Sequence, residues 1–290
     1  MELSSPPSLR SLYGAALLAA LRRPSRPASL SDLSLGLVAP VSRSRLAAYN
    51  RVCGYRLSDE LPPTYPHVLA FPLAMALMTR PDFPLPLVGI VHLANTITVY
   101  RPVLASEALS FTVFAADLRP HERGRQVDLV AEARVADEVV WTGRSTYLHR
   151  ESSPSSPSSP APAPAPSLPA PAAVWRVDRR VGPDYADVSG DHNPVHTSRL
   201  AARLFGFPGQ IAHGMWSKAR CLAALEGRLP AAYTVEVAFK LPVVLPARVA
   251  FSAEPVDGGY RLSLRGARSG KPHLVGSIRG IPSDSERTSG

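Results

Sequence analysis

Residues 185–215 carry the side chains of this sequence that are best suited to moving protons. The stretch holds Asp191, His196 and His213 among small polar residues and glycines. A carboxylate and an imidazole held close together can act as a general acid and a general base. The sequence contains no glycine-rich phosphate loop and no nucleophile elbow. The pattern therefore predicts acid–base chemistry without an obvious nucleophile.

The order of Asn193 and Pro194 predicts the start of a helix. An asparagine side chain accepts a hydrogen bond from a free N–H group at a helix N-terminus, and proline fits the first helical position. We expect this helix to end near Gly206. Asp191 then lies in the loop before the helix, and His196 lies in its first turn, where the helix dipole favours a neutral imidazole. A neutral His196 can accept a proton, and Asp191 can donate one or hold a water molecule.

Gly214 predicts a third component of such a site. It opens a second helix, expected over Met215 to about Leu225. The N–H groups at a helix N-terminus carry partial positive charge, and a glycine lets a substrate carbonyl approach them closely. Such a donor would stabilise the oxygen of an enolate. A base, an acid and an oxyanion donor suit the addition or removal of water beside a thioester carbonyl.

The segment from Tyr185 to Met215 resembles the hydratase 2 motif of MaoC-like dehydratases, the (R)-specific enoyl-CoA hydratases. The family pattern is Tyr-x-x-x-Ser-Gly-Asp-x-Asn-Pro-x-His followed by His-Gly-Met, and every position is filled here. The likeness covers about the last third of the chain. It implies a hot-dog fold, in which a sheet wraps around one long helix, and a water molecule bound by Asp191 and His196.

The other residues of the motif are expected to support the site or bind substrate. Helix capping is enough to explain Asn193, while Tyr185 and Ser189 are expected to brace the loop. His213 is expected to order the tip of the second helix through a hydrogen bond rather than to carry a proton.

A zinc set is the alternative interpretation of the same side chains. Asp191, His192, His196 and His213 could supply four ligands. These residues lie on a proline-containing loop, and His192 is expected to point away from Asp191. The sequence therefore favours acid–base catalysis, with no metal and no cofactor.

The composition limits the partners of the protein. The chain has 290 residues and a formal net charge of +9, and its arginines are scattered rather than clustered. This distribution argues against nucleic-acid binding and is compatible with an anionic carrier, either coenzyme A or an acidic acyl carrier protein. Cys53 and Cys221 are expected to be unpaired thiols in a reducing compartment. The apolar run 13–21 is too short to span a membrane, so we expect a cytoplasmic protein without stable membrane insertion.

Changes in composition divide the chain into an N-terminal stretch, two units, a linker and a tail. We expect a flexible N-terminus at 1–30, a first unit at 31–151, a linker of serine, proline and alanine at 152–173, a second unit at 174–282 and a tail at 283–290. Helices are expected near 45–52 and 68–78, and strands near 34–41, 88–100, 107–117, 126–136, 138–149, 174–181, 232–241, 247–255, 260–268 and 273–279.

The two units align with each other as copies. Residues 49–55 align with 185–191, with tyrosine, valine and glycine identical, and His67 falls opposite His213. The first copy has lost the acid–base pair, since Tyr55 stands opposite Asp191 and Glu60 stands opposite His196. We therefore expect one active site, in the second unit, and a first unit whose apolar stretch 68–78 accommodates the acyl chain.

Together these features predict an α+β double hot-dog enzyme of fatty-acid metabolism. It would dehydrate a (3R)-3-hydroxyacyl thioester to a trans-2-enoyl thioester, or catalyse the reverse hydration. His196 would take the proton from the α-carbon, Asp191 would protonate the departing hydroxyl, and the Gly214 N–H would bind the thioester oxygen. The alternatives are an acyl-thioester hydrolase and a non-catalytic acyl-binding module. Coenzyme A and acyl carrier protein both stay open as carriers, and monomer and homodimer both stay open as assemblies.

Overall fold

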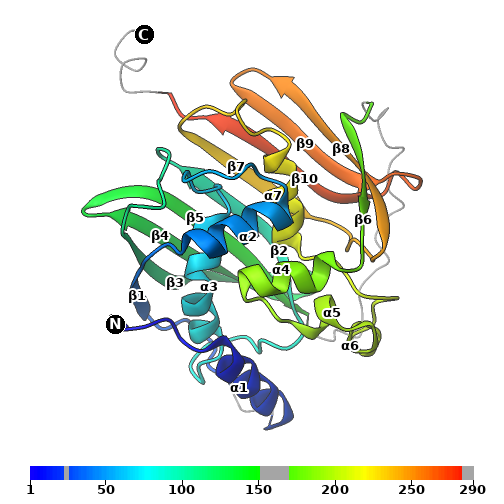
Figure 1. Cartoon of the computed structure of the whole chain (residues 1–290). Coiled ribbons are helices and arrows are strands. Elements are labelled where there is room, and N and C mark those ends of the chain that lie inside the picture. The colour runs from blue at the N-terminus through cyan, green and yellow to red at the C-terminus, as the bar shows by residue number, and fades with distance from the viewer. Residues whose placement is uncertain (23–25, 151–169, 283–290) are drawn as a thin grey trace.

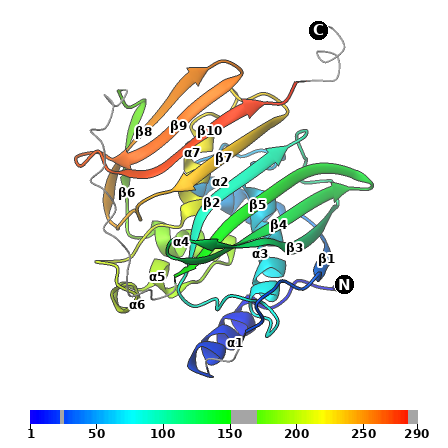
Figure 2. The same ribbon diagram turned by 180° about the vertical axis from the view of Figure 1, so that it is seen from behind.

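A single ten-stranded antiparallel sheet organises the molecule, with its helices on one face (Figure 1). The computed structural model describes residues 1–22, 26–150 and 170–282. Viewed from behind, the sheet lies in front of the helices (Figure 2). The first unit comprises β1 (Ser34–Ala39), α2 (Arg43–Cys53), α3 (Tyr65–Met78), β2 (Ile90–Val99), β3 (Leu109–His121), β4 (Gly124–Val135) and β5 (Glu138–Arg150). The second unit comprises β6 (Ala173–Val177), α4 (Val181–Ser189), α5 (Pro194–Thr197), α6 (Arg199–Leu204), α7 (Gly214–Ala223), β7 (Tyr233–Phe239), β8 (Ala247–Val256), β9 (Gly259–Gly266) and β10 (Pro272–Gly280).

The strand order shows an internal repeat. The strands run β1-β3-β4-β5-β2-β7-β10-β9-β8-β6 across the sheet. The strands β1 to β5 of the first unit correspond, in chain order, to β6 to β10 of the second unit. When each strand of the first half is replaced by its counterpart, the order of the second half results, read in reverse. The halves join through antiparallel β2 and β7, where the hydroxyls of Thr98 and Thr234 lie 2.9 Å apart. The α+β double hot-dog fold predicted from the sequence is confirmed.

The helices α3 and α7 are the central helices of the two units. Helix α3 is apolar on nearly every side and is buried along most of its length, as expected for a helix enclosed between a sheet and other helices. Helix α7 carries the fully buried Lys218, whose ammonium group donates to Asn95 Oδ1 (2.6 Å) and to the carbonyls of Asn95 and Val235 (3.1 Å each). Lys218 therefore ties the second central helix to both strands at the seam.

The segment from β6 to α7 differs in two ways from the sequence-based expectation. The strand β6 ends at Val177, and residues from Val181 form α4, because Asp178 turns the chain by accepting a hydrogen bond from the Arg180 N–H (2.9 Å). The single helix expected from Asn193 to about Gly206 is divided into α5 and α6. Ser198 adopts an extended conformation between them and caps α6 by accepting from the Ala201 N–H (3.2 Å).

The N-terminal segment contains a helix where the sequence predicts flexibility. Helix α1 (Leu9–Arg22) lies against α3, and Leu9, Leu12 and Tyr13 pack on an apolar cluster of the first unit. The partner residues of this helix lie about sixty or more residues further along the chain, so local composition does not reveal them. No helix in the described part of the chain is long and apolar enough to cross a membrane.

The other boundaries stay predictions. Of the linker expected at 152–173, residues 152–169 lie outside the described residues. Ala173, the last residue of the expected linker, belongs to β6. The tail at 283–290 also lies outside them. The alignment of His67 with His213 also stays a prediction: His67 lies in the first turn of α3, whereas His213 is the N-cap of α7.

Candidate active site

A tight turn after α4 places Asp191 at the centre of the site. Gly190 ends α4 with a left-handed φ of 79°, a conformation that glycine adopts at little cost. The hydroxyl of Ser189 donates to the Tyr185 carbonyl (2.7 Å) and accepts from the Asp191 N–H (3.2 Å). Ser189 therefore braces the loop that presents the carboxylate.

The Asp191 carboxylate is held by two donors. Its Oδ1 accepts from the Tyr13 hydroxyl (2.7 Å) and from the Asn193 N–H (3.2 Å). Its Oδ2 lies 3.8 Å from His213 Nε2, and 30% of the side chain remains exposed. Burial raises the pKa of Asp191, but the two neighbouring histidines, the Tyr13 hydroxyl and the Asn193 N–H together bring the pKa below its usual value. Asp191 is therefore a carboxylate at neutral pH.

The hydrogen bonding of His196 leaves one ring nitrogen able to accept a proton. Its Nδ1 lies 2.9 Å from the Ile211 carbonyl oxygen. Because a carbonyl only accepts, we assign the hydrogen of the neutral ring to Nδ1, which leaves a lone pair on Nε2. Burial lowers the pKa of His196, and the Asp191 charge opposes this only in part. His196 is thus a neutral base above pH 6.5.

Close packing holds His196 in place. The Gln210 side-chain amide donates to the His196 carbonyl. A Cβ at Gly182 would lie only 2.0 Å from the same oxygen, so glycine is required there.

His213 stacks on His196 and is oriented by the backbone. The two ring centroids are 3.7 Å apart, and His213 Nε2 donates to the Asp191 carbonyl (2.9 Å). Burial, together with the nearby His196, lowers the pKa of His213 to about 3, so its ring is neutral. Its Nδ1 is buried and has no hydrogen-bond partner among the described residues.

The remaining predicted residues surround these three. Asn193 caps α5 by accepting from the Val195 N–H (3.3 Å). The Tyr185 ring lies 4.8 Å from the His213 ring. Gly214 is the first residue of α7, and a Cβ there would lie 3.0 Å from the Phe239 ring. The structure therefore brings all seven predicted site residues into one region.

Sequence reasoning missed the contributions of the first unit and of α1. Tyr13 donates directly to Asp191 from a helix 178 positions earlier in the chain. The half-buried His92 ring stacks on Tyr147, with centroids 4.6 Å apart, and lies 4.9 Å from Phe239. A lone tyrosine in a short apolar segment carries no pattern that could have identified its partner.

The acidic and imidazole groups are also close enough to be considered as metal ligands. Asp191, His196 and His213 each offer a ligand atom within 4.8 Å of the others. One ring nitrogen of each histidine already binds a backbone carbonyl. One nitrogen from each ring and a carboxylate oxygen therefore remain as possible metal ligands. That the site works without a metal stays a prediction.

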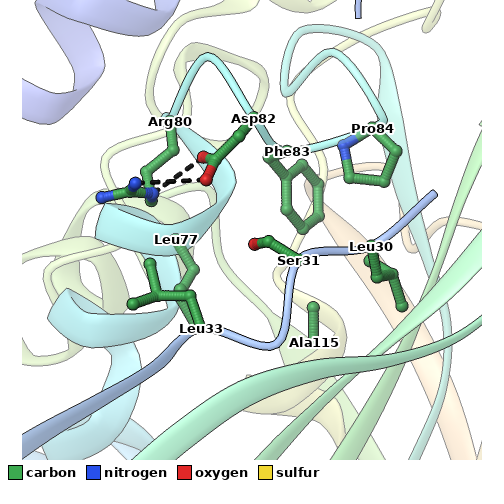
Figure 3. Close-up of a pocket in the computed structure, with 9 residues that line it drawn as sticks. All are labelled: Leu30, Ser31, Leu33, Leu77, Arg80, Asp82, Phe83, Pro84 and Ala115. Carbon is green, nitrogen blue, oxygen red and sulfur yellow. Dashed lines mark hydrogen bonds and ion pairs between the residues drawn. The ribbon is translucent and has the colours of Figure 1, made fainter. Parts of the chain in front are cut away.

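The predicted acyl groove along 68–78 is packed rather than open in this conformation. Phe71, Met75 and Met78 are buried in a cluster that α1 covers. A cavity at the end of α3 has a volume of only about 10 Å³ and is bordered by the ion pair of Arg80 and Asp82 (2.8 Å; Figure 3). Such a volume is suited at most to one water molecule.

Comparison with known proteins relates the chain to one family. Residues 178–265 match the family described as MaoC like domain. The 3-hydroxyacyl-thioester dehydratase X of Mycobacterium tuberculosis is 41% identical over 259 residues, which cover 89% of this chain and 90% of that protein.

Solved structures agree with this relationship. The crystal structure of HtdX from Mycobacterium tuberculosis superposes with a TM-score of 0.77 at 40% identity and covers 86% of this chain and 100% of that chain. A second Mycobacterium tuberculosis protein, described as having a double hot-dog fold, superposes with a TM-score of 0.52 at 14% identity and covers 87% of this chain and 94% of that chain. The second likeness concerns the fold alone.

Proposed function

Because the chain belongs to the MaoC-like dehydratase family, we propose that it removes water from (3R)-3-hydroxyacyl thioesters to give trans-2-enoyl thioesters, and catalyses the reverse hydration. The observation that carries this proposal is the meeting of a carboxylate, Asp191, with a neutral imidazole, His196, whose Nε2 is free to accept a proton. The enzyme is accordingly a hydro-lyase of fatty-acid metabolism.

In the dehydration direction, His196 begins the reaction as the base. Its Nε2 takes a proton from the α-carbon, and the electrons of that C–H bond move onto the thioester oxygen. The N–H of Gly214, at the positive end of α7, stabilises the developing charge. The C–O bond at the β-carbon then breaks, and the double bond forms between the two carbons.

The state of Asp191 decides how the hydroxyl receives its proton. Sequence reasoning assigned this step to Asp191, but its lowered pKa makes the carboxylate the resting form. We therefore propose that the proton taken by His196 returns to the departing hydroxyl, while Asp191 accepts a hydrogen bond from that hydroxyl and stabilises the transient imidazolium. In hydration the same groups hold a water molecule, and His196 carries its proton to the α-carbon.

We propose that Tyr13 positions the carboxylate. Its hydroxyl occupies Oδ1, so Oδ2 is the oxygen available to the substrate hydroxyl or to water. His213 orders the loop through the Asp191 carbonyl and packs on the His196 ring, which limits the orientations of the base.

The substrate is proposed to be an acyl chain on coenzyme A or on acyl carrier protein. Both carriers are anionic, and the net charge of +9 would attract either one. A double unit supplies both halves of the fold, and we propose a cytoplasmic monomer or homodimer. Size measurement in solution separates the two assemblies.

The decisive assay is hydration of trans-2-enoyl-CoA substrates of increasing chain length by the purified protein. Loss of the conjugated enoyl absorbance with formation of the (3R)-3-hydroxyacyl product is the expected result. Release of free thiol would instead indicate a thioester hydrolase. Binding without either reaction, with acyl carrier protein substrates also unchanged, would indicate a non-catalytic module.

A further inference from the structure

The short helix α6 presents leucines to solvent on the face where a surface helix usually carries polar side chains. Ala202 is the buried residue of this helix and packs with Val195 and Ile211. Leu200 and Leu204 stand two positions before and after Ala202, so they lie on the opposite face of the helix. Leu200 is 71% exposed and Leu204 is 81% exposed. In both views α6 lies at the outer edge of the molecule, beyond α5 (Figures 1 and 2).

Phe205 and two arginines complete this surface, which we call the α6 patch (Arg199, Leu200, Arg203, Leu204 and Phe205). The Phe205 side chain is 47% exposed. Arg199 and Arg203 are exposed and lie one turn apart on one flank of the leucines. Neither guanidinium has an ion-pair partner among the described residues. The sequence from 192 to 225 contains no aspartate and no glutamate. The α6 patch is therefore both apolar and positively charged.

This composition favours an acidic protein with some apolar surface as the partner. Contiguous exposed apolar side chains mark sites where another protein or a membrane binds. The unpaired arginines favour a negatively charged partner. A second copy of this chain fits poorly, because a twofold contact of the patch with itself would bring the arginines of both copies together. A helix of six residues also offers less than two turns to a membrane surface.

The α6 patch adjoins the segment that carries the proposed base. Arg199 follows His196 by three residues. Behind the patch, Ala202 packs with Ile211, whose carbonyl oxygen lies 2.9 Å from His196 Nδ1. The same small cluster therefore supports both the proposed base and the patch. A partner that docks here stands at the edge of the site to which a thioester must be delivered.

We propose that the α6 patch docks acyl carrier protein, the acidic protein that carries acyl thioesters. This inference rests on the proposed function and chooses between its two carriers. Coenzyme A supplies negative charge, but it offers the leucines and the phenylalanine no extended apolar surface. Acidic side chains of the carrier protein would pair with the two arginines, and its apolar side chains would cover the leucines. Its flexible arm would then bring the thioester to His196.

Binding of octanoyl acyl carrier protein to the full-length protein tests this surface directly. The carrier protein is taken from the same organism as this chain. Its saturated acyl group cannot be hydrated, so fluorescence anisotropy of a labelled carrier protein measures binding without turnover. Leu204→Ser removes apolar surface, and Arg203→Glu reverses one charge. The matched controls are Leu57→Ser, at a 68% exposed position in the first unit, and Arg51→Glu, at an exposed position in α2.

We expect Leu204→Ser and Arg203→Glu each to weaken binding about five- to thirtyfold, the effect of losing a central interface residue. Added salt should weaken binding to the unchanged protein more than binding to Arg203→Glu, because the variant has lost part of the charge attraction. Both control variants should bind as the unchanged protein does. Equal binding by the patch variants and the unchanged protein, or no binding of the carrier protein at all, would overturn the proposal.

Two further measurements identify other partners of the α6 patch. Light scattering gives the mass of the protein in solution. If the unchanged protein is a dimer and Leu204→Ser is a monomer, the patch joins two copies and the proposal fails. Sedimentation with vesicles of anionic phospholipid measures membrane binding. If Leu204→Ser loses vesicle binding but keeps carrier-protein binding, the patch contacts a membrane and the proposal fails.

Hydration assays separate this proposal from the proposed function. In Leu204→Ser and Arg203→Glu, kcat/KM for trans-2-octenoyl acyl carrier protein should fall as binding does, and kcat/KM for trans-2-octenoyl-CoA should not change. An equal loss with both substrates would show that the patch only supports the catalytic loop. If neither substrate is hydrated but the variants still weaken carrier binding, the proposed function fails and the docking surface stands. If octenoyl-CoA is hydrated and the carrier protein never binds, the docking surface fails alone.

Discussion

The two repeats end their first helix, α2 or α4, in the same way and then diverge. Both α2 and α4 finish on a left-handed glycine, and both place a tyrosine, Tyr49 or Tyr185, in the core. After Gly190 the chain presents Asp191 and inserts α5, which carries His196, followed by α6. After Gly54 it presents Tyr55 and reaches α3 directly. A shared scaffold thus supports two different corners, and the loop, not the sheet, decides which one holds the proposed acid–base pair.

The difference also extends to what covers each corner. At the catalytic corner α1 packs on the first unit, and Tyr13 reaches Asp191. At the other corner a cavity of about 580 Å³ stays open, and the side chain nearest to a Cβ on Gly54 belongs to Arg220. The shorter loop of the first unit thus leaves open space at its corner.

Alanine substitution of the aligned residues His196 and Glu60 should show the largest contrast in kcat between the two corners. His196→Ala should lower kcat for enoyl-CoA hydration about 10²–10⁴-fold, because the base is removed. Glu60→Ala should leave kcat unchanged. The exposed His192→Ala, in the same loop, controls for loss of a histidine. Equal losses in His196→Ala and Glu60→Ala would contradict a single active site.

Histidines with lowered pKa values near the catalytic corner should make stability depend on pH. Burial lowers the pKa of His213 to about 3, that of His67 to about 4 and that of His92 to about 3, from a usual value of 6.5. The unfolded chain therefore binds protons that the folded chain excludes. Each contribution is complete above about pH 6.5 and is lost as the pH falls, at up to about 1.4 kcal/mol per pH unit for each histidine.

Urea unfolding between pH 7 and pH 5 checks this prediction. His213→Gln keeps a donor for the Asp191 carbonyl and should reduce the pH slope by about a quarter, since His196, whose pKa is also lowered, contributes together with His67, His92 and His213. An unchanged slope would show that His213 does not titrate on unfolding.

The two end-cap glycines should have equal effects on stability and unequal effects on rate. Gly54→Ala and Gly190→Ala each force a side chain into a left-handed conformation, which costs about 1–2 kcal/mol. Both should lower the free energy of unfolding by a similar amount. Only Gly190→Ala should lower kcat, because it shifts Asp191 and meets Leu9 in α1. A matching rate loss in Gly54→Ala would show that the corners are coupled.

Removing the Tyr13 hydroxyl should have a smaller effect on rate. Tyr13→Phe takes away a donor that lowers the pKa of Asp191. The pKa of Asp191 should rise, so the acidic limb of the pH–rate profile should move to higher pH, with a loss of about two- to tenfold at neutral pH. Tyr100→Phe, an exposed site, is the control. A uniform loss of rate with no shift of the profile would indicate a packing role only.

Metal removal should have no effect. Acid–base catalysis by Asp191 and His196 needs no metal, so dialysis against a chelator should leave enoyl-CoA hydration unchanged. Loss of activity that returns with added zinc would show that Asp191, His196 and His213 act as ligands.

Much of the fold was accessible from local sequence patterns. Alternating apolar residues identified the strands β2 to β5 and β7 to β10, since side chains alternate across a half-buried sheet. The apolar run at 68–78 identified α3. The division of the expected helix into α5 and α6 at Ser198 was missed. Helix propensity alone does not show that a serine adopts an extended conformation and caps a second helix.

The composition of the proposed catalytic site was determined by the sequence itself, because the motif residues between Tyr185 and Gly214 lie close in the chain and their local turns bring them together. Their finer chemistry was decided by the tertiary structure. The bond from His196 Nδ1 to the Ile211 carbonyl leaves Nε2 as the free base, and burial keeps both imidazoles neutral. The Tyr13 contact and the open cavity at Tyr55 depend on segments that are distant in sequence. Such segments come close together only in the complete fold, in which β2 and β7 join the two halves of the sheet and the helices α3 and α7 pack against it.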